Sequence, residues 1–197
     1  MLAQATKPPA SSTLLVLGDS LSAEYGLQRG QGWVALLEAR LKRDAPSVKV
    51  VNASISGDTT SGGRSRLPAL LTLHKPDVLV IELGGNDALR GLPIAMTQDN
   101  LQAMTQAARA SDAKVLLVGM QVPPNYGPAY TRQFADMFVS VAKANQAELV
   151  PFMLKGIADG PDATQWFQAD RIHPVAKAHP IILQTLWPPI KKLLRVK

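Results

Sequence analysis

The sequence predicts a parallel sheet of about five strands with helices on both faces, in a three-layer α/β/α fold. Two observations carry this prediction. Short apolar runs rich in β-branched residues alternate with longer segments of helical spacing, which is typical of strands joined by crossover helices. Two of these runs, TLLVL and DVLVIEL, are almost continuously apolar, as expected for strands buried on both faces.

Each expected element rests on its own stretch of the chain. The strands are the β-branched apolar runs, and the helices are the segments between them in which apolar residues recur at helical spacing. The expected strands are 13–17, 48–53, 78–83, 114–120 and a short one at 149–152, and the expected helices are 33–42, 63–73, 99–110, 129–144 and 175–194.

Length and composition predict one folded domain at 13–197. The chain has 197 residues, of which 46% are hydrophobic, and it contains no cysteine. This apolar content is sufficient for a sizeable core. The missing thiols exclude disulfide scaffolds, thiolate metal sites and a cysteine nucleophile. No stretch reaches the roughly 18 to 20 uninterrupted apolar residues of a membrane-spanning helix, so we expect no integral membrane segment.

The N-terminal stretch MLAQATKPPASS is polar and rich in proline and serine. It has neither the basic start nor the apolar centre of an intact secretory signal, so we expect residues 1–12 to form a flexible lead-in. Ala3-Gln4-Ala5 has the small-x-small form of a signal-cleavage site. The remnant of a shortened signal is therefore an alternative interpretation of this stretch.

The chain is basic, with a formal net charge of +6 and a pI near 9.7, which would suit nucleic acid or anionic lipid as a partner. Its one local cluster lies at the C-terminus, in a helix whose apolar residues are spaced to face a core. Basic residues in a last turn also suit the helix dipole. We therefore interpret the cluster as a solvated helix face and expect no nucleic-acid partner. The cluster consists of Lys191, Lys192, Arg195 and Lys197.

Cofactor and metal patterns fail on their context. Residues 30–35 match G-x-G-x-x-A, but the match does not directly follow the first strand, and Asn52 and Ala53 stand where an acidic residue is required. The phosphate-loop pattern is absent from the sequence. The three histidines, His74, His173 and His179, do not have zinc-ligand spacing. We expect neither a cofactor nor a metal.

Ser20 lies at the end of the first expected strand, in LLVLGDSLS. In open α/β sheets, ligands bind outside the carboxyl ends of the strands, and these ends are followed here by loops at 18–20, 54–58, 84–87 and 120–124. We expect Gly18 to let the chain turn sharply and to lift the Ser20 hydroxyl clear of the sheet. The G-x-S-x-G elbow of α/β-hydrolases is absent from the sequence.

A serine nucleophile needs a base and a group that orients the base. Asp170 precedes His173 by three residues, a spacing that brings both side chains to one side of a turn or helix start. His173 could then face Ser20 while Asp170 binds its other nitrogen. The alternative is a surface histidine that caps the following helix. We interpret His74 and His179 as structural, since neither has a partner at a useful spacing.

The developing oxyanion needs preorganised hydrogen-bond donors. Gly57 offers an N–H that no side chain covers, and Asn86 offers an amide on a glycine-rich loop. Together with the N–H of Ser20 they would form a hole with three donors. Ordinary turn chemistry is the alternative for Gly57 and Asn86.

In order and spacing, GDSLS, NASISGDTTSGG, ELGGNDALRG and DRIHP resemble the four sequence blocks of the GDSL or SGNH hydrolases. The likeness is greatest to the bacterial thioesterase I/lysophospholipase L1/arylesterase group, and it covers most of residues 12–180. It implies a flavodoxin-like sheet, Ser20 as nucleophile, His173 as base, Asp170 as its orienter, and an oxyanion hole at Ser20, Gly57 and Asn86. Residues 87–92 would form a loop that lines the acyl site and shifts on binding.

Three departures from the group's pattern leave the candidate catalytic atoms in place. Arg171 and Ala88 stand where the group commonly has glycine, and Val175 replaces a common asparagine. They bear on substrate preference and loop mobility. We expect Asp19, Asp58 and Asp87 to make loop hydrogen bonds. The expected substrate-binding residues are Asp87, Ala88, Leu89, Arg90, Leu92, Pro123 and Tyr126.

The sequence thus predicts a serine esterase or thioesterase that hydrolyses acyl or aryl esters and thioesters, lysophospholipids included, through an acyl-enzyme. The expected partners are small-molecule substrates and a transient lipid surface. One alternative is a carbohydrate deacetylase on the same fold, which the low aromatic content of 5% disfavours. The other is a non-catalytic lipid- or ligand-binding module. The resemblance favours a periplasmic or secreted protein, with a cytoplasmic one as the alternative.

Overall fold

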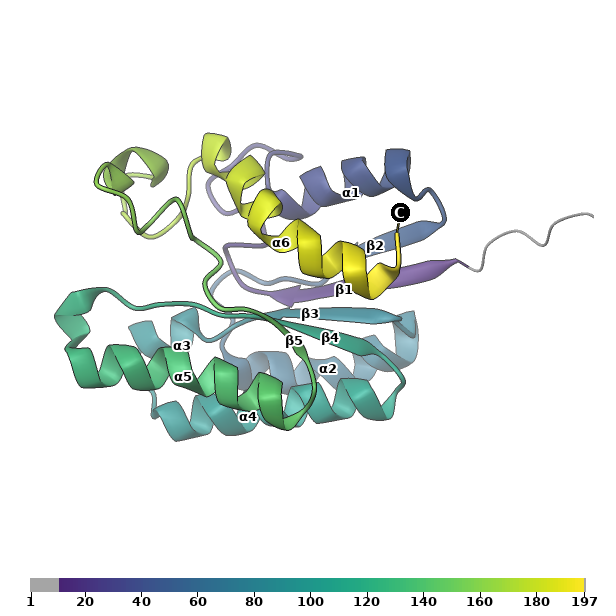
Figure 1. Ribbon diagram of the computed structural model, residues 1–197, viewed down its shortest axis with the longest axis horizontal. Coiled ribbons are helices and arrows are strands. Elements are labelled where there is room, and N and C mark those ends of the chain that lie inside the picture. The colour runs from purple at the N-terminus through teal and green to yellow at the C-terminus, as the bar shows by residue number, and fades with distance from the viewer. Residues whose placement is uncertain (1–10, 197) are drawn as a thin grey trace, which may run out of the picture.

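The computed structural model describes residues 11–196 and has a sheet between two layers of helices (Figure 1). The strands are β1 (Ser12–Gly18), β2 (Val48–Asn52), β3 (Val78–Glu82), β4 (Lys114–Val118) and β5 (Glu148–Val150). The helices are α1 (Trp33–Asp44), α2 (Thr60–His74), α3 (Gly85–Leu89), α4 (Ile94–Ala110), α5 (Pro128–Ala144) and α6 (His179–Leu194). Short 3-10 turns occur at Pro124–Tyr126, Ala163–Trp166 and Ala176–Ala178.

The strand order is β2-β1-β3-β4-β5, and every neighbouring pair is parallel. This is the flavodoxin-like order, so the predicted fold class is confirmed. Helices α1 and α6 cover one face of the sheet, and α2, α4 and α5 cover the other (Figure 1). The chain changes direction across the sheet between β1 and β3, and such a switch point opens a crevice at the carboxyl ends of the strands.

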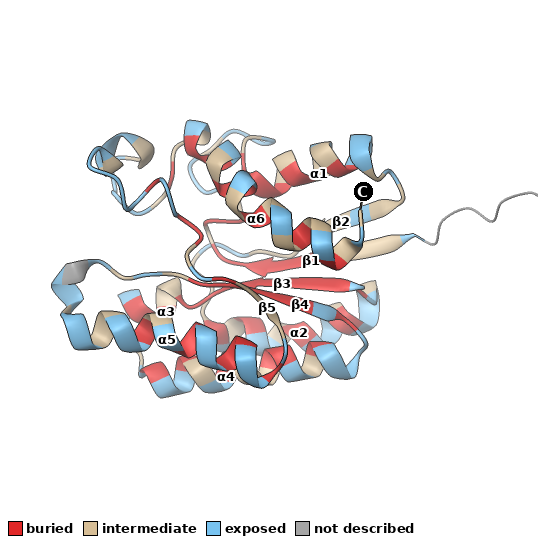
Figure 2. Ribbon diagram, in the orientation of Figure 1, coloured by how far each residue is buried: buried red, intermediate tan, exposed pale blue. Residues whose placement is uncertain are grey.

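Successive side chains of the central strands point to opposite faces of the sheet, so each strand contributes to both layers of the core. In β1, Leu14 and Val16 point toward α1 and α6, while Leu15 and Leu17 point toward the opposite layer. All four side chains are fully buried, as the red central strands of Figure 2 show. Such burial accounts for the nearly continuous apolar runs, because both faces of a central parallel strand lie in a core. None of the helices within residues 11–196 is long and apolar enough to cross a membrane.

Several boundaries differ from the predicted ones for local reasons. The lead-in predicted at 1–12 lies outside the described residues up to position 10, and Ser12 already belongs to β1. Helix α2 begins at Thr60 because the Thr59 side chain accepts a hydrogen bond from the Gly62 N–H at 3.3 Å and caps the first turn. Helix α3 was predicted as loop. Helix α6 begins only at His179, after a 3-10 turn.

His179 is structural, as predicted, and it supplies a missing helix cap. Helix α1 follows Gly32, which has no side chain to accept from the first helical N–H groups. The His179 Nδ1 atom, 146 residues further on, accepts from the Trp33 N–H at 3.1 Å. His179 is only 2% exposed. Its imidazole thus joins α1 to α6, and this contact requires an unprotonated Nδ1.

Acidification is expected to weaken the fold through His179. Burial lowers the pKa of the His179 imidazole, although the backbone at Pro174 and the charge of Glu24 oppose this effect. Near its ordinary pKa of about 6.5, the imidazole takes up a proton in the unfolded chain that the folded chain rejects. The stability that the neutral His179 imidazole gives to the fold is therefore complete above about pH 6.5. It is lost as the pH falls below that value, by at most about 1.4 kcal/mol per pH unit.

Urea unfolding at about pH 7.5 and about pH 5.5 checks this expectation. His179→Asn is the matched control, since its amide oxygen can accept the Trp33 N–H in place of Nδ1 and does not titrate. The wild type should lose more stability than this variant on acidification. Equal losses would show that His179 does not carry the effect, because the other titrating groups are the same in both proteins.

Candidate active site

The candidate site lies at the carboxyl ends of β1 and β3, where the strand order changes direction. Ser20 follows β1 in a turn that two backbone hydrogen bonds close, from the N–H groups of Ser22 and Ala23 to the Asp19 carbonyl at 3.2 and 3.0 Å. Gly18 is needed here for space, and its φ is not positive. A Cβ at Gly18 would come within 2.8 Å of Ser22 Oγ and 2.9 Å of Glu82 Oε2.

Ser20, His173 and Asp170 form a continuous hydrogen-bonded chain. The Ser20 Oγ lies 2.9 Å from His173 Nε2, and His173 Nδ1 lies 2.7 Å from Asp170 Oδ2. With the imidazole proton on Nδ1 facing the carboxylate, Nε2 accepts the proton of the serine hydroxyl. The tertiary structure thus brings Ser20 to the pair 153 residues away.

The segment that carries His173 is held on both sides. An isolated bridge joins Phe167 to Pro174, and the Gln168 N–H donates to the His173 carbonyl at 2.7 Å. The Gln168 side chain donates to the Tyr25 carbonyl at 2.9 Å, and the Tyr25 ring lies 4.2 Å from the imidazole, centre to centre. These contacts fix the imidazole against the turn that carries Ser20.

Asp170 stays ionised over the working pH range. Burial alone would raise the pKa of its carboxyl, but hydrogen bonds from the N–H groups of His173 and Ile172, together with the imidazole, lower that pKa to about 2. The N–H bonds measure 3.0 and 2.9 Å. A permanent negative charge at this position holds the Nδ1 proton and stabilises an imidazolium.

Two buried carboxyls lie beneath Ser20. Glu82 Oε2 accepts from the Ser22 hydroxyl at 2.7 Å and from the Asp19 N–H at 3.3 Å. Burial, and then the charge of Asp19, raises the pKa of Glu82 well above its ordinary value, and burial raises that of Asp19 to about 6. The negative charge of either carboxyl disfavours ionisation of the other, and Glu82 anchors the serine turn through its two hydrogen bonds. Its sequence signal was a glutamate near the end of the otherwise apolar run VLVIEL.

The three proposed oxyanion donors lie on neighbouring segments. Asn86 lies in α3, not in the predicted loop, and its Nδ2 donates one hydrogen to Asp19 Oδ2 at 2.9 Å. Among residues 11–196 no group accepts its second hydrogen, which is therefore available to a ligand. Gly57 has φ +78, which favours glycine, and its loop is joined to β1 by the Ile55 N–H, which donates to the Gly18 carbonyl at 3.0 Å. That these groups act together stays a prediction.

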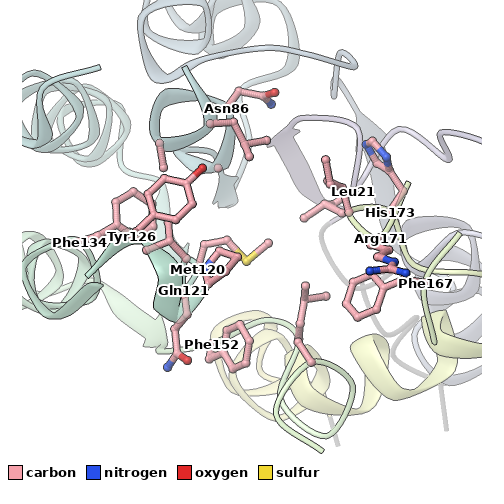
Figure 3. Close-up of a pocket in the computed structure, with 18 of the residues that line it drawn as sticks. Leu21, Asn86, Met120, Gln121, Tyr126, Phe134, Phe152, Phe167, Arg171 and His173 are labelled. Atoms are coloured by element: carbon pink, nitrogen blue, oxygen red, sulfur yellow. The ribbon is translucent and has the colours of Figure 1, made fainter. Parts of the chain in front are cut away.

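A cavity of about 590 Å³ opens beside Ser20 and His173 (Figure 3). Four of the predicted substrate-binding residues line it, namely Ala88, Leu89, Pro123 and Tyr126. The lining surface is mainly apolar, with Tyr126 and Phe134 on one side and Phe167 on the other (Figure 3). Four of the chain's few aromatic residues gather here: Tyr126, Phe134, Phe152 and Phe167.

Three of the predicted substrate-binding residues do not line this cavity. Asp87 is fully buried, and it accepts from the Thr60 N–H at 2.9 Å and from the hydroxyls of Thr60 and Thr97, so it ties α3 to α2 and α4. Arg90 instead donates to the Gly57 carbonyl at 2.7 Å, and Leu92 lies beyond α3. The predicted loop at 87–92 thus begins as a helix, whose pitch turns Asp87 inward.

Two cavity residues that follow β5, Phe152 and Leu154, were not among the predicted site residues. Ligands bind outside the carboxyl ends of the strands in open α/β sheets, and this rule, which selected the loops after the other four strands, applies equally to the loop after β5. Asp19 and Asp58 make the expected loop hydrogen bonds, with Asp58 also paired to Arg66 at 2.8 Å, whereas Asp87 binds between helices instead. Within the described residues, no group of three histidine, aspartate or glutamate side chains could hold a metal ion.

Comparison with known proteins connects this geometry to a family. The model of the GDSL-like Lipase/Acylhydrolase family matches residues 16–181. The chain belongs to this family. The resemblance found in its four sequence blocks is thereby confirmed.

Individual relatives are similar along nearly the whole chain. Esterase TesA of Pseudomonas aeruginosa is 52% identical over 189 residues, which are 96% of this chain and 92% of the relative. Thioesterase 1/protease 1/lysophospholipase L1 of Escherichia coli is 42% identical over 173 residues, or 88% of this chain and 80% of the relative. A crystal structure of TesA superposes with a TM-score of 0.88 at 53% identity and covers 92% of this chain and 99% of its own.

Proposed function

We propose that this protein is a serine ester hydrolase that cleaves acyl and aryl esters and thioesters through an acyl-enzyme. The hydrogen-bonded chain from Ser20 Oγ to His173 Nε2 and from Nδ1 to Asp170 is the observation that supports it most directly. A serine hydroxyl becomes a useful nucleophile when an oriented base accepts its proton.

In the proposed reaction, Ser20 Oγ attacks the carbonyl carbon and its proton passes to His173 Nε2. Asp170 stabilises the imidazolium, and the tetrahedral oxyanion accepts hydrogen bonds from the N–H groups of Ser20 and Gly57 and from Asn86 Nδ2. When the bond to the leaving group breaks, Nε2 returns the proton to the departing oxygen or sulfur. His173 Nε2 then takes a proton from a water molecule, which attacks the carbonyl carbon of the acyl-enzyme. The bond to Ser20 Oγ breaks, Nε2 returns the proton to this oxygen, and the acid is released.

The cavity supports acyl and aryl substrates over sugars. Its leucine, methionine, valine and phenylalanine side chains offer an apolar surface, whereas a sugar needs many hydroxyl partners. The aromatic residues gathered here fit an aryl or acyl group equally well. The names of the two relatives include esterase, thioesterase and lysophospholipase, which agrees with this range of substrates. A periplasmic or secreted location, which the family resemblance implies, is part of the same proposal.

Two measurements on the wild-type protein test the function. Turnover of p-nitrophenyl esters from acetyl to dodecanoyl should give a chain-length profile set by the cavity. A fluorophosphonate should label the folded protein once, on the peptide that contains Ser20, and should leave heat-unfolded protein unlabelled. Failure of both turnover and labelling would instead support the non-catalytic binding module.

A further inference from the structure

Arg171 brings a positive charge to the edge of the cavity. Its side chain lines the same cavity as Ser20 and His173 (Figure 3). No ion pair found within residues 11–196 includes Arg171, and the residue is exposed. A guanidinium offers five donors in a planar fork, which suits carboxylate and phosphate oxygens.

The nearby carboxylates are engaged elsewhere. Both oxygens of Asp170 accept hydrogen bonds from His173, and one of them also accepts from Ile172. Asp19 is buried and accepts from Asn86 and from the Leu21 N–H. Asp159, which also lines the cavity, accepts from the Gly156 N–H at 2.6 Å. The Arg171 charge is therefore available to a ligand.

The backbone at Arg171 has a defined conformation. Its φ is +59, in the left-handed region that glycine adopts most readily, and its N–H donates to the Gln168 carbonyl at 2.9 Å. Gln168 is itself bound to the Tyr25 and Pro174 carbonyls. The start of the Arg171 side chain is thus held in place, and asparagine is the neutral residue that best tolerates the same φ.

The position of His173 indicates which part of a substrate Arg171 would contact. His173 must return a proton to the leaving group, so the leaving group lies on the His173 side of Ser20. Arg171 precedes His173 by two residues in the same held segment. We propose that Arg171 forms a leaving-group subsite for an anion, a phosphate or carboxylate carried by the alcohol or thiol part of the substrate. This inference rests on the proposed function.

The test compares two esters with the same acyl group, 4-butyryloxybenzoate, which carries a carboxylate on its leaving group, and its neutral methyl ester. For each protein, the ratio of the two kcat/KM values cancels any general change in activity. Arg171→Asn should lower this ratio by about threefold to fivefold, the range of an exposed ion pair, and Arg171→Lys should retain most of it. The difference should shrink at high salt.

Lys75→Asn is the matched control. Lys75 is also exposed and has φ +43, but it lies at the end of α2, just before the amino end of β3 and away from the site. This variant loses the same charge and should leave the ratio unchanged. An equal fall in both asparagine variants would overturn the subsite in favour of the overall charge of the chain.

Further substrate pairs locate the anion. In p-nitrophenyl hydrogen glutarate the carboxylate lies on the acyl part, and p-nitrophenyl pentanoate is its neutral counterpart. The ratio of their kcat/KM values should not respond to Arg171→Asn, and a response would overturn the assignment to the leaving group. Butyryl-CoA against butyryl-pantetheine, and a lysophosphatidylglycerol against its monoacylglycerol, distinguish a thioester source from a phospholipid source. An insensitive ratio in a protein that hydrolyses the neutral ester overturns the subsite alone. Failure to hydrolyse any ester overturns the proposed function together with it.

Discussion

Replacing Ser20 by alanine is expected to lower kcat/KM for p-nitrophenyl butyrate by roughly three to four orders of magnitude. The variant has no oxygen to attack the carbonyl, and His173 has no hydroxyl to deprotonate. Ser20 is half-buried, and its only side-chain partner within the described residues is His173 Nε2. The fold should therefore tolerate the change, as matched circular dichroism and urea unfolding would show.

A combination with His173→Ala sharpens the Ser20 test. If the two residues act as one unit, the double variant should be about as inactive as either single variant, since the second change removes nothing further. Ser140→Ala makes the same chemical change on an exposed position of α5 and should retain full activity. Substantial turnover by Ser20→Ala would show that another group is the nucleophile.

Replacing Asn86 by alanine is expected to lower kcat by about 100-fold to 1000-fold with little change in KM. The amide hydrogen that is not bound to Asp19 is free to meet charge that develops on the carbonyl oxygen only as the tetrahedral intermediate forms. Ground-state binding depends instead on the apolar cavity. Steady-state kinetics with p-nitrophenyl esters separates the two constants.

Asn86 could also act indirectly, because it donates to Asp19 Oδ2 at 2.9 Å. A double-mutant cycle with Asp19→Ala resolves this point. If Asn86 only positions Asp19, then Asp19→Ala should cost as much as Asn86→Ala, and the double variant should cost no more. If Asn86 donates to the oxyanion, Asn86→Ala should cost further activity in the Asp19→Ala background. A kcat within threefold of wild type in Asn86→Ala would remove Asn86 from the oxyanion hole.

Local pattern predicted most of the candidate site because each part lies next to a strong signal. Ser20 and Asn86 follow strands with almost continuous apolar runs, Gly57 follows β2, and parallel strands place their carboxyl ends at one edge. Asp170 and His173 are close in sequence, so a single turn brings them together. What local pattern could not predict was a conformation set by distant packing. Helix α3 is too short for its periodicity to be recognised, and it is held by Asp87 binding to Thr60 and Thr97.

The sequence by itself determined the alternating strand and helix order, the family, and the identities of the groups that can carry the chemistry. These follow from local periodicity and from residues close in sequence. Only the tertiary structure decided that Asp87 faces inward, that Glu82 supports the serine turn, that His179 caps a helix 146 residues away, and that Arg171 lines the cavity. Each depends on contacts between segments far apart along the chain, and a side chain's exposure or pKa is set by such neighbours and not by its own sequence position.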